Sequence, residues 1–233
     1  MSSVNCEAMS STLARSAVQS SWLGRIRYDD ALSIQRAAAA EIAAGGAERL
    51  LLLEHEPVFT LGRNAARGDV LFTPERCREL GIEVRETDRG GKVTYHGPGQ
   101  LVGYPILSLS PDRRDVKRYV TDLEEVLIRS LADFGIAASR SSVRERVTSV
   151  WVGNDKIAAI GVHLSRWITT HGFAVNVTSQ PLAFFRGIVP CGITDGGVTS
   201  MEKAGGKQHP LEDVAEAVRQ HFGEVFDRDI ISE

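Results

Sequence analysis

The spacing of hydrophobic residues predicts helices in three stretches of the chain. Between residues 115 and 134 apolar positions recur every three or four residues, and Gly135 stands where a helix commonly ends. Helices are also expected over residues 29–44, which Gly45-Gly46 would end, and over residues 211–222 after a proline. The apolar stripe of the first stretch consists of Val116, Tyr119, Val120, Leu123, Leu127, Leu131 and Phe134.

Residues that favour helix starts support the first of these boundaries along the chain and predict one further short helix. Asp29 or Asp30 is a suitable N-cap for the helix that ends near residue 44. Thr73, followed by a proline and a glutamate, is typical of the start of a short helix that ends at Gly81. An extended segment is expected to follow from Ile82.

Short apolar runs predict strands between the helices. Residues 50–54 form a run long enough only for a buried strand. Residues 149–152 and 156–164 flank a turn at 153–155 and predict a hairpin, with a further strand at 168–177 beside it. Because strands cluster in hairpins and helices lie between the clusters, we expect an α+β fold with a mixed, largely antiparallel sheet flanked by helices.

Composition narrows the class of protein. The chain has 233 residues with 27 Lys and Arg against 30 Asp and Glu, a net charge of −3, which disfavours a nucleic-acid binder. No apolar run reaches the length of a membrane span, so no membrane partner is expected. We expect residues 1–20 to form a flexible N-terminal tail and residues 21–233 to form a single domain, because no linker-like stretch divides them.

The cysteines are few and unpaired in spacing. Cys6, Cys77 and Cys191 form an odd, sparse set that fits neither a disulfide framework nor a zinc site. No metal site is therefore predicted. Free thiols suit a reducing compartment, and we expect a cytoplasmic protein.

A glycine-rich segment, residues 89–106, stands out from the rest of the chain. It reads RGGKVTYHGPGQLVGYPI and leaves few side chains to fill a core. Dense glycine lets the backbone approach a ligand closely and leaves N–H groups free to bind it, but it is also typical of paired tight turns. The segment matches neither GxGxxG nor a Walker motif, so a phosphate cradle is not predicted.

Two further residues carry candidate chemistry. Cys191 lies between Pro190 and Gly192, a setting that fits either a buried structural cysteine or a nucleophile. Lys156 leads directly into an apolar strand, where it is either solvated at the strand end or desolvated with a lowered pKa. Gly161 in the middle of that strand indicates close approach of another group to the backbone.

Taken together, four strings resemble one known family, the lipoate-protein octanoyltransferases. They are LLLLEHEPVFTLGR at 50–63, DRGGKVTYHGPGQLVGYPI at 88–106, KIAAIGVHLSRWITTHGFAVNV at 156–177 and IVPCGITDGGVTS at 188–200. The second and fourth strings are highly specific, and the resemblance covers most of the chain.

This resemblance implies a fold like the catalytic domain of biotin and lipoate ligases, and it implies site residues. Cys191 would be the acyl-thioester nucleophile and Lys156 its acid/base partner, and we expect His55 to support the site at most indirectly. The implied substrate-binding residues are Arg89, Gly90, Gly91, Lys92, Val93, Thr94, Tyr95, His96, Ala159, Ile160, Gly161, Gly172, Phe173 and Ala174.

The resemblance also implies the reaction and its partners. An octanoyl group would pass from acyl carrier protein to a lysine on the lipoyl domains of 2-oxoacid dehydrogenases and on the glycine cleavage H protein. Because the donor is already a thioester, neither ATP nor a metal cofactor is expected. We expect the enzyme to be a monomer.

Three alternatives remain open at this point. An ATP-dependent lipoate or biotin ligase would share the scaffold but would not need Cys191. A second alternative keeps the cysteine and moves the acyl group between lipoyl domains. The third is a catalytically silent module that binds acyl-proteins, which the presence of both Cys191 and Lys156 disfavours.

Overall fold

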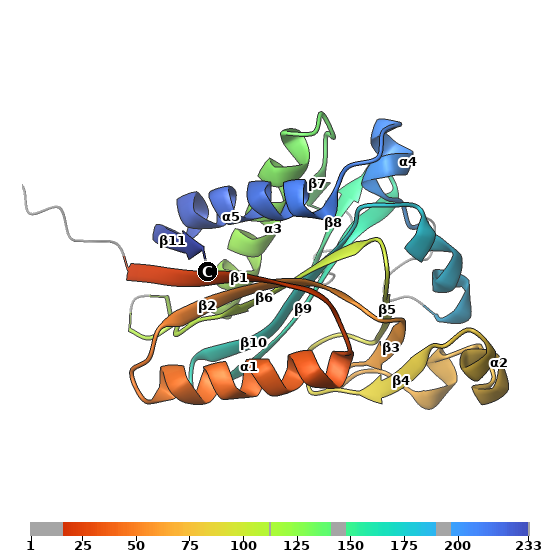
Figure 1. Ribbon diagram of the computed structural model, residues 1–233, viewed down its shortest axis with the longest axis horizontal. Coiled ribbons are helices and arrows are strands. Elements are labelled where there is room, and N and C mark those ends of the chain that lie inside the picture. The colour runs from red at the N-terminus through yellow and green to blue at the C-terminus, as the bar shows by residue number, and fades with distance from the viewer. Residues whose placement is uncertain (1–15, 112, 141–147, 190–196, 233) are drawn as a thin grey trace, which may run out of the picture.

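The structure, a computed structural model, describes residues 16–111, 113–140, 148–189 and 197–232. In this part of the chain a mixed sheet of eight strands, in the order β11-β1-β2-β6-β10-β9-β8-β7, runs through the centre of the molecule (Figure 1). β1 pairs in parallel with β11 and β2, and the other neighbouring strands are antiparallel. The strands are β1 (Ser16–Ile26), β2 (Glu48–His55), β6 (Gln100–Ile106), β7 (Ser139–Arg140), β8 (Ser149–Val152), β9 (Asp155–Ser165), β10 (Ile168–Asn176) and β11 (Arg228–Ser232).

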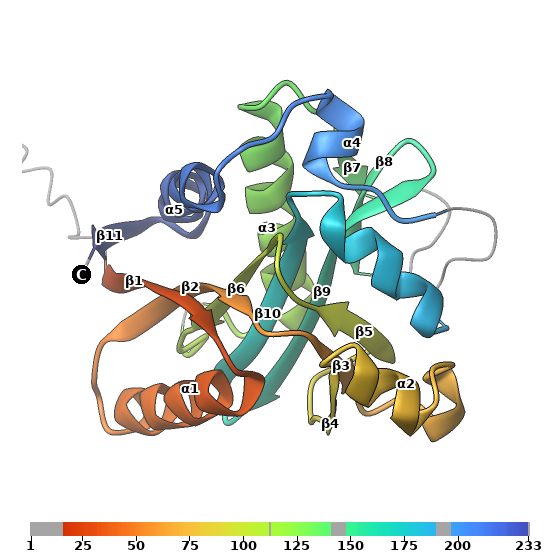
Figure 2. The ribbon, with the colours of Figure 1, turned by 45° about the vertical axis from the view of Figure 1, so that its right-hand side comes forward.

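A second sheet of three strands, in the order β4-β3-β5, lies beside one end of the large sheet (Figure 2). Its strands are β3 (Val58–Leu61), β4 (Glu83–Glu86) and β5 (Val93–His96). The helices are α1 (Tyr28–Ala43), α2 (Pro74–Glu79), α3 (Val116–Ala132), α4 (Met201–Gly205) and α5 (Leu211–Phe226), with 3-10 turns η1 (Arg67–Asp69) and η2 (Gln180–Gly187). The predicted α+β fold with a mixed, largely antiparallel sheet is confirmed.

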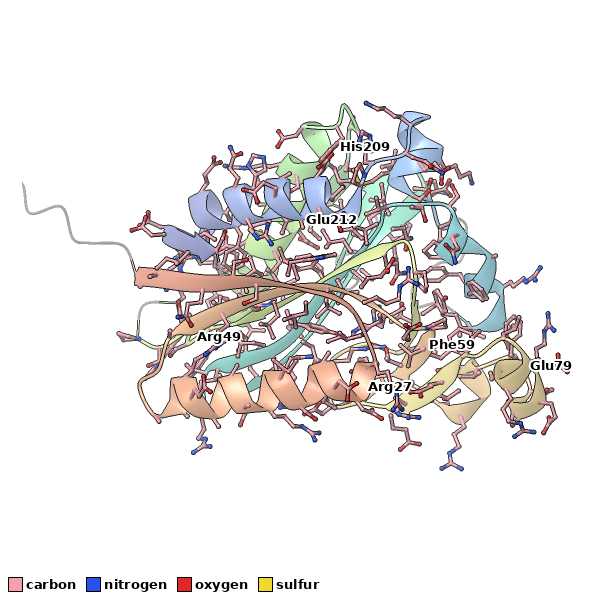
Figure 3. The ribbon with its side chains drawn as sticks, viewed as in Figure 1. Arg27, Arg49, Phe59, Glu79, His209 and Glu212 are labelled. Atoms are coloured by element: carbon pink, nitrogen blue, oxygen red, sulfur yellow. The ribbon has the colours of Figure 1, made fainter. Side chains whose placement is uncertain are left out.

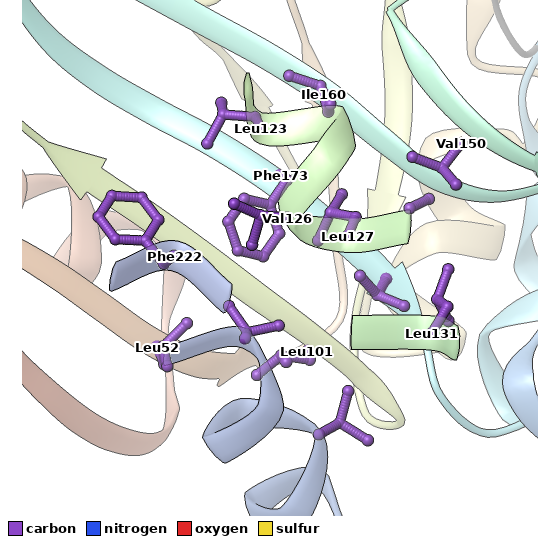
Figure 4. Packing of buried hydrophobic residues seen from close by; sticks show 14 of the residues in the cluster. Leu52, Leu101, Leu123, Val126, Leu127, Leu131, Val150, Ile160, Phe173 and Phe222 are labelled. Carbon is purple, nitrogen blue, oxygen red and sulfur yellow. The ribbon is translucent and has the colours of Figure 1, made fainter. Parts of the chain in front are cut away.

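Helices cover both faces of the large sheet. On one face α3 and α5 pack on an apolar cluster that includes Leu52, Leu101, Leu127, Phe173 and Phe222 (Figure 4). On the other face α1 packs on a smaller cluster that the opposite sides of β2, β6 and β10 provide (Figure 2). Because successive side chains of each strand point to opposite faces of the sheet, the strands contribute to two separate hydrophobic cores.

Periodicity located the helices well and their caps less well. The predicted helices correspond to α1, α2, α3 and α5, and Thr73 caps α2 by accepting a hydrogen bond from Arg76 N at 3.2 Å. The expected N-cap at Asp29 or Asp30 is wrong. Both carboxylates lie in the first turn of α1, and Arg27 occupies the cap position without a side-chain cap bond.

The expected boundary of the N-terminal tail at residue 20 also requires correction. Residues 16–20 belong to β1, where they pair with β11 on one side, and Val18 and Ser20 are fully buried. Residues 1–15 lie outside the described residues. The composition of this segment is typical of a flexible tail, so the sequence did not predict a strand there. One partner of the strand, β11, lies at the other end of the chain.

The glycine-rich segment contains a core strand in addition to its turns. β6 is buried along its whole length between β2 and β10. Gly103 makes this possible, because a Cβ atom there would lie 2.1 Å from the Phe173 ring. The glycine that weakened the strand signal is the one that admits an aromatic ring from the neighbouring strand.

Ion pairs fasten the small sheet to the large one. Arg27, labelled in Figure 3 near the start of α1, donates a hydrogen bond to Glu83 at 2.9 Å. Arg85 binds Asp29 at 2.9 Å, so β4 is held against the start of α1. Phe59 fills the core of the small sheet with its ring centroid 5.7 Å from that of Tyr95. The loop between β4 and β5, which contains Arg89, is thereby held between the two sheets.

Candidate active site

The predicted acid/base residue, Lys156, is buried near the start of β9. Only 8 % of the residue is exposed, and its Nζ lies 5.3 Å from the centre of the Trp151 ring on β8. Its backbone is held on both sides, since Lys156 N donates to Gly197 O at 3.0 Å and Thr199 N donates to Lys156 O at 2.9 Å. The alternative of a solvated lysine at a strand end is therefore wrong.

The predicted nucleophile, Cys191, lies outside the described residues. The chain that follows it is nevertheless fastened to the lysine, because residues 197–199 run beside Lys156 and Asp155 accepts a hydrogen bond from Gly197 N at 2.8 Å. Cys77, in contrast, is buried in α2, and burial raises the pKa of its thiol. The pairing of Cys191 with Lys156 stays a prediction.

Beyond Lys156, β9 and β10 present a strip of sheet that is almost without side chains. Ala159 pairs with Ala174 and Gly161 with Gly172 across the two strands. Residues two apart on a strand share a face, so these two pairs lie in succession on the same face. We call these four residues the bare strip. All four residues line the cavity described below, although backbone oxygens of Gly90 and Gly103 lie 3.1 and 2.1 Å from the Cβ positions of Gly161 and Gly172.

The loop from Arg89 to Lys92 crosses over the bare strip. Gly90 N donates to Val162 O on β9 at 2.9 Å, while Lys92 O accepts from Gly62 N at 2.9 Å on the other side. Close packing here depends on glycine, since a Cβ atom at Gly62 would lie 2.5 Å from Gly91 O. The glycines thus also serve close packing of backbone on backbone, which is neither the ligand contact nor the paired tight turns that the sequence left open.

Arg89 fixes this loop. Its guanidinium group donates to Thr60 O at 2.6 Å, to Thr60 Oγ1 at 2.8 Å and to Gly90 O at 2.9 Å, and the residue is 8 % exposed. Hydrogen bonds from a charged donor to buried oxygens are stronger than neutral ones. Arg89 therefore holds β3 and the loop together at the edge of the cavity.

Between the bare strip and this loop lies a cavity of about 250 Å³. Lys156 and all of the predicted substrate-binding residues except Tyr95 line it. Tyr95 packs in the core of the small sheet, stacked on Phe184 with centroids 4.8 Å apart. The structure thus brings together residues from four separate segments of the sequence.

Sequence reasoning missed a polar network at the Lys156 end of the cavity. His96 Nδ1 lies 3.2 Å from Gln100 Oε1, Gln100 Nε2 donates to Asn176 Oδ1 at 2.8 Å, and Asn176 Nδ2 donates to Thr199 O at 2.9 Å. Thr199 in turn binds the backbone of Lys156. An asparagine at the end of an otherwise apolar strand was the available signal. Other lining residues not predicted are Tyr28, Asn64, Tyr104, Thr148, Ala158, His171, Phe185 and Val198.

The histidines around the cavity are kept uncharged by burial. Burial lowers the pKa of His55 to about 4, and its Nε2 lies 2.7 Å from the Tyr104 hydroxyl. Burial, with His55 and Arg89 nearby, holds the pKa of His96 well below its ordinary value. Near neutral pH His96 is therefore a polar, neutral part of the cavity wall, and neutral His55 lies behind Tyr104, which lines the cavity.

The described residues hold neither a metal-binding cluster nor a membrane-spanning helix. Among these side chains, no group of three or more His, Cys, Asp or Glu residues is placed to hold a metal ion. None of the helices that the structure describes is long and apolar enough to cross a membrane.

Comparison with solved structures identifies the fold. A lipoate protein ligase from Thermoplasma acidophilum superposes with a TM-score of 0.72 and 16% identity, covering 94% of this chain and 87% of that one. A biotin protein ligase from Aquifex aeolicus gives a TM-score of 0.54 and 14% identity over 90% of this chain and 70% of that one. At these identities the likeness shows the fold alone, and it confirms the ligase-like catalytic domain.

Sequence comparison identifies the family. Residues 27–223 match the family model described as lipoyl protein ligase A/B catalytic domain. Octanoyltransferases from Solibacter usitatus and Caldicellulosiruptor bescii are 51% and 47% identical, over 90% of this chain and 93% and 91% of their own lengths. An octanoyltransferase from Myxococcus xanthus is 49% identical over 88% of this chain, which spans 58% of that longer protein. The chain therefore belongs to the octanoyltransferases of the lipoyl protein ligase A/B catalytic domain family, and it is an acyltransferase of protein lipoylation.

Proposed function

We propose that this enzyme takes an octanoyl group from acyl carrier protein onto the thiol of Cys191 and passes it to a lysine of a lipoyl domain, with Lys156 as the acid/base. The observation that carries the proposal is the position of Lys156. It is buried at one end of a cavity of acyl-chain size, and its backbone is fastened to the segment that follows Cys191. Relatives about half identical in sequence are octanoyltransferases.

In the first half-reaction the Cys191 thiol gives its proton to the Lys156 amine, and the thiolate attacks the carbonyl carbon of the donor thioester. A bond from Cys191 sulfur to carbon forms, the bond to the carrier thiol breaks, and the leaving thiolate takes the proton from the Lys156 ammonium. Exchange of one thioester for another is nearly neutral in free energy, so the step needs neither ATP nor a metal. An unperturbed cysteine is only a few per cent ionised near neutral pH, which is why a base beside it matters.

In the second half-reaction the amine of the acceptor lysine attacks the Cys191 thioester. A C–N bond forms, the C–S bond breaks, and the proton lost by the amine passes through neutral Lys156 to the cysteine sulfur. Cys191 and Lys156 exchange one proton throughout and titrate as a pair. The enzyme returns to its starting protonation state after each transfer.

The acyl chain would lie on the bare strip beneath the Arg89–Lys92 loop. Burying an octanoyl tail contributes about 0.8 kcal/mol per methylene, or roughly 5 kcal/mol in all. His96, which is neutral and hydrogen-bonded to Gln100 at the Lys156 end of the cavity, supplies a polar group that carries no charge. On this account the acceptors are the lipoyl domains of 2-oxoacid dehydrogenases and the glycine cleavage H protein, and the enzyme acts in the cytoplasm as a monomer.

The test is the mass of the intact protein after incubation with octanoyl-acyl carrier protein in the absence of ATP. We expect one octanoyl group that hydroxylamine removes and that Cys191→Ser does not acquire, whereas the control Cys77→Ser acquires it like the wild type. Labelling of Cys191→Ser at the wild-type rate, or labelling that requires ATP, would contradict the proposal. A donor that works only as an acylated lipoyl domain would indicate transfer between lipoyl domains instead.

The role of Lys156 has a separate test. Lys156→Ala is expected to slow acylation of Cys191 at neutral pH by about a hundredfold or more, as removal of a general base typically does. The loss should shrink as pH approaches the thiol pKa, where the thiolate forms without help. A pH–rate profile unchanged from the wild type would refute the assignment.

A further inference from the structure

A second cavity, of about 360 Å³, lies between α1 and the hairpin of β9 and β10. Asp88, His163 and Thr170 line it, together with residues of α1. Among the described residues that line the two cavities, His171 is the only one that both share. A single side chain thus stands where the two spaces meet.

His171 is held tightly in this position. Its Nε2 lies 2.8 Å from Asp88 Oδ1, its backbone N–H donates to Gln35 Oε1 on α1 at 2.8 Å, and it is 2 % exposed. Asp88 also lies 3.6 Å from His163 Nε2, so the carboxylate joins both histidines. The ring cannot swing aside without losing its hydrogen bond to Asp88.

The backbone at His171 is unusual for a residue within a strand. Its φ is +58°, in the left-handed region that side chains other than glycine rarely adopt. His171 nevertheless keeps its place in the ladder and pairs with Val162 on β9. Backbone strain of this kind costs roughly 1–3 kcal/mol and commonly persists at functional positions.

The bare strip ends at the same place. The next cross-strand pair on the face of Gly161 and Gly172 is His163 with Thr170, and both carry side chains. Asp88 connects His163 to His171 across this end. His163 and Thr170 line only the second cavity, so His171 is the side chain that meets a chain on the strip at this end.

We propose that His171, fixed by Asp88, is the end wall of the acyl cavity and sets the longest acyl chain that the enzyme accepts. The inference rests on the proposed function, because it assumes that the acyl chain lies on the bare strip. Val162, which pairs with His171, is six residues along β9 from Lys156, or about 20 Å. The lysine side chain and the imidazole ring occupy part of that span. An extended octanoyl group reaches roughly 9 Å, because each of its seven C–C bonds advances about 1.3 Å along the zigzag chain.

Removal of the ring would join the two cavities. His171→Gly suits the left-handed backbone, deletes the wall and opens the space beside α1 to longer chains. His163→Ala is the matched control, because His163 lines only the second cavity and contacts the same Asp88. Asp88 is half exposed in its side chain, so its carboxylate can be solvated once the ring is gone.

The test compares binding of octanoate and dodecanoate by calorimetry, which needs no turnover. Each methylene newly buried strengthens binding about fourfold, so His171→Gly should raise affinity for dodecanoate relative to octanoate by at least about tenfold. His163→Ala should keep the wild-type ratio. A folded His171→Gly protein with the wild-type ratio would overturn the proposal. Should thermal melting show that this variant is unfolded, His171→Asn carries the same test, since asparagine tolerates a left-handed backbone.

Failure of the wall and failure of the proposed function give different results. If wild type forms the Cys191 thioester and the affinity ratio does not change, only the wall is refuted. If no thioester forms, the proposed function fails, and a changed ratio still shows that His171 closes the cavity. Competition between octanoyl and dodecanoyl donors then shows whether the wall controls transfer as well as binding.

Discussion

Filling the bare strip should shorten the acyl chain that the enzyme prefers. Ala159 lies on β9 opposite Ala174, lines the cavity and is absent from the buried cores on either side of the sheet. Ala159→Leu adds three carbon atoms to the strip and displaces up to three methylenes of an octanoyl chain. At about 0.8 kcal/mol each, octanoyl transfer should lose about 2.4 kcal/mol, or roughly 50-fold in kcat/KM.

The assay is kcat/KM for octanoyl and butanoyl donors, measured side by side. A butanoyl chain should lose less, because it has fewer methylenes that the new side chain can displace. The matched control is Ala37→Leu, on the exposed side of α1, which should leave both donors unchanged. Equal losses for both chain lengths, or no loss for octanoyl in a folded protein, would show that the acyl chain does not lie on this strip.

Two further predictions concern stability. Gly172→Ala should destabilise the fold by more than about 2 kcal/mol in denaturant titrations, because the new Cβ atom would lie 2.1 Å from Gly103 O. The control Gly68→Ala should be nearly neutral, because nothing lies within 4 Å of its Cβ position. Equal effects of the two substitutions would refute the packing argument. Burial lowers the pKa of His55 from 6.5 to about 4, so the unfolded chain takes up the proton more readily. This contribution to stability is fully present above about pH 6.5 and falls by about 3 kcal/mol as pH drops through 4. His55→Asn should flatten part of that slope, and an unchanged slope would contradict it.

Local patterns were sufficient where the partner of a segment lies nearby in the chain. The α3 stripe, the hairpin of β8 and β9 and the cap at Thr73 all follow from spacing or from a single side chain. All of the substrate-binding residues that the specific strings implied, except Tyr95, line the cavity, because short motifs bring the required glycines with them. Lys156 was identified as a site residue through its motif, while its burial comes from the segment at 197–199.

Long-range pairing explains what the sequence did not reveal. β1 joins β11 from the opposite end of the chain, and β6 is a core strand only because Gly103 receives the Phe173 ring. The wall formed by Asp88 and His171 joins residues 83 positions apart. The left-handed backbone of His171 could not be predicted from the sequence around it. Its neighbours Thr170 and Gly172 pair with β9 as residues of any strand do.

The most direct test of the central claim is a crystal structure of the protein after reaction with octanoyl-acyl carrier protein and no acceptor. The account predicts an acyl group joined to the sulfur of residue 191, beside the amine of Lys156. Its chain should lie along Ala159, Gly161, Gly172 and Ala174, beneath the loop that Arg89 holds. An acyl group attached elsewhere, or a sulfur remote from the Lys156 amine, would contradict it.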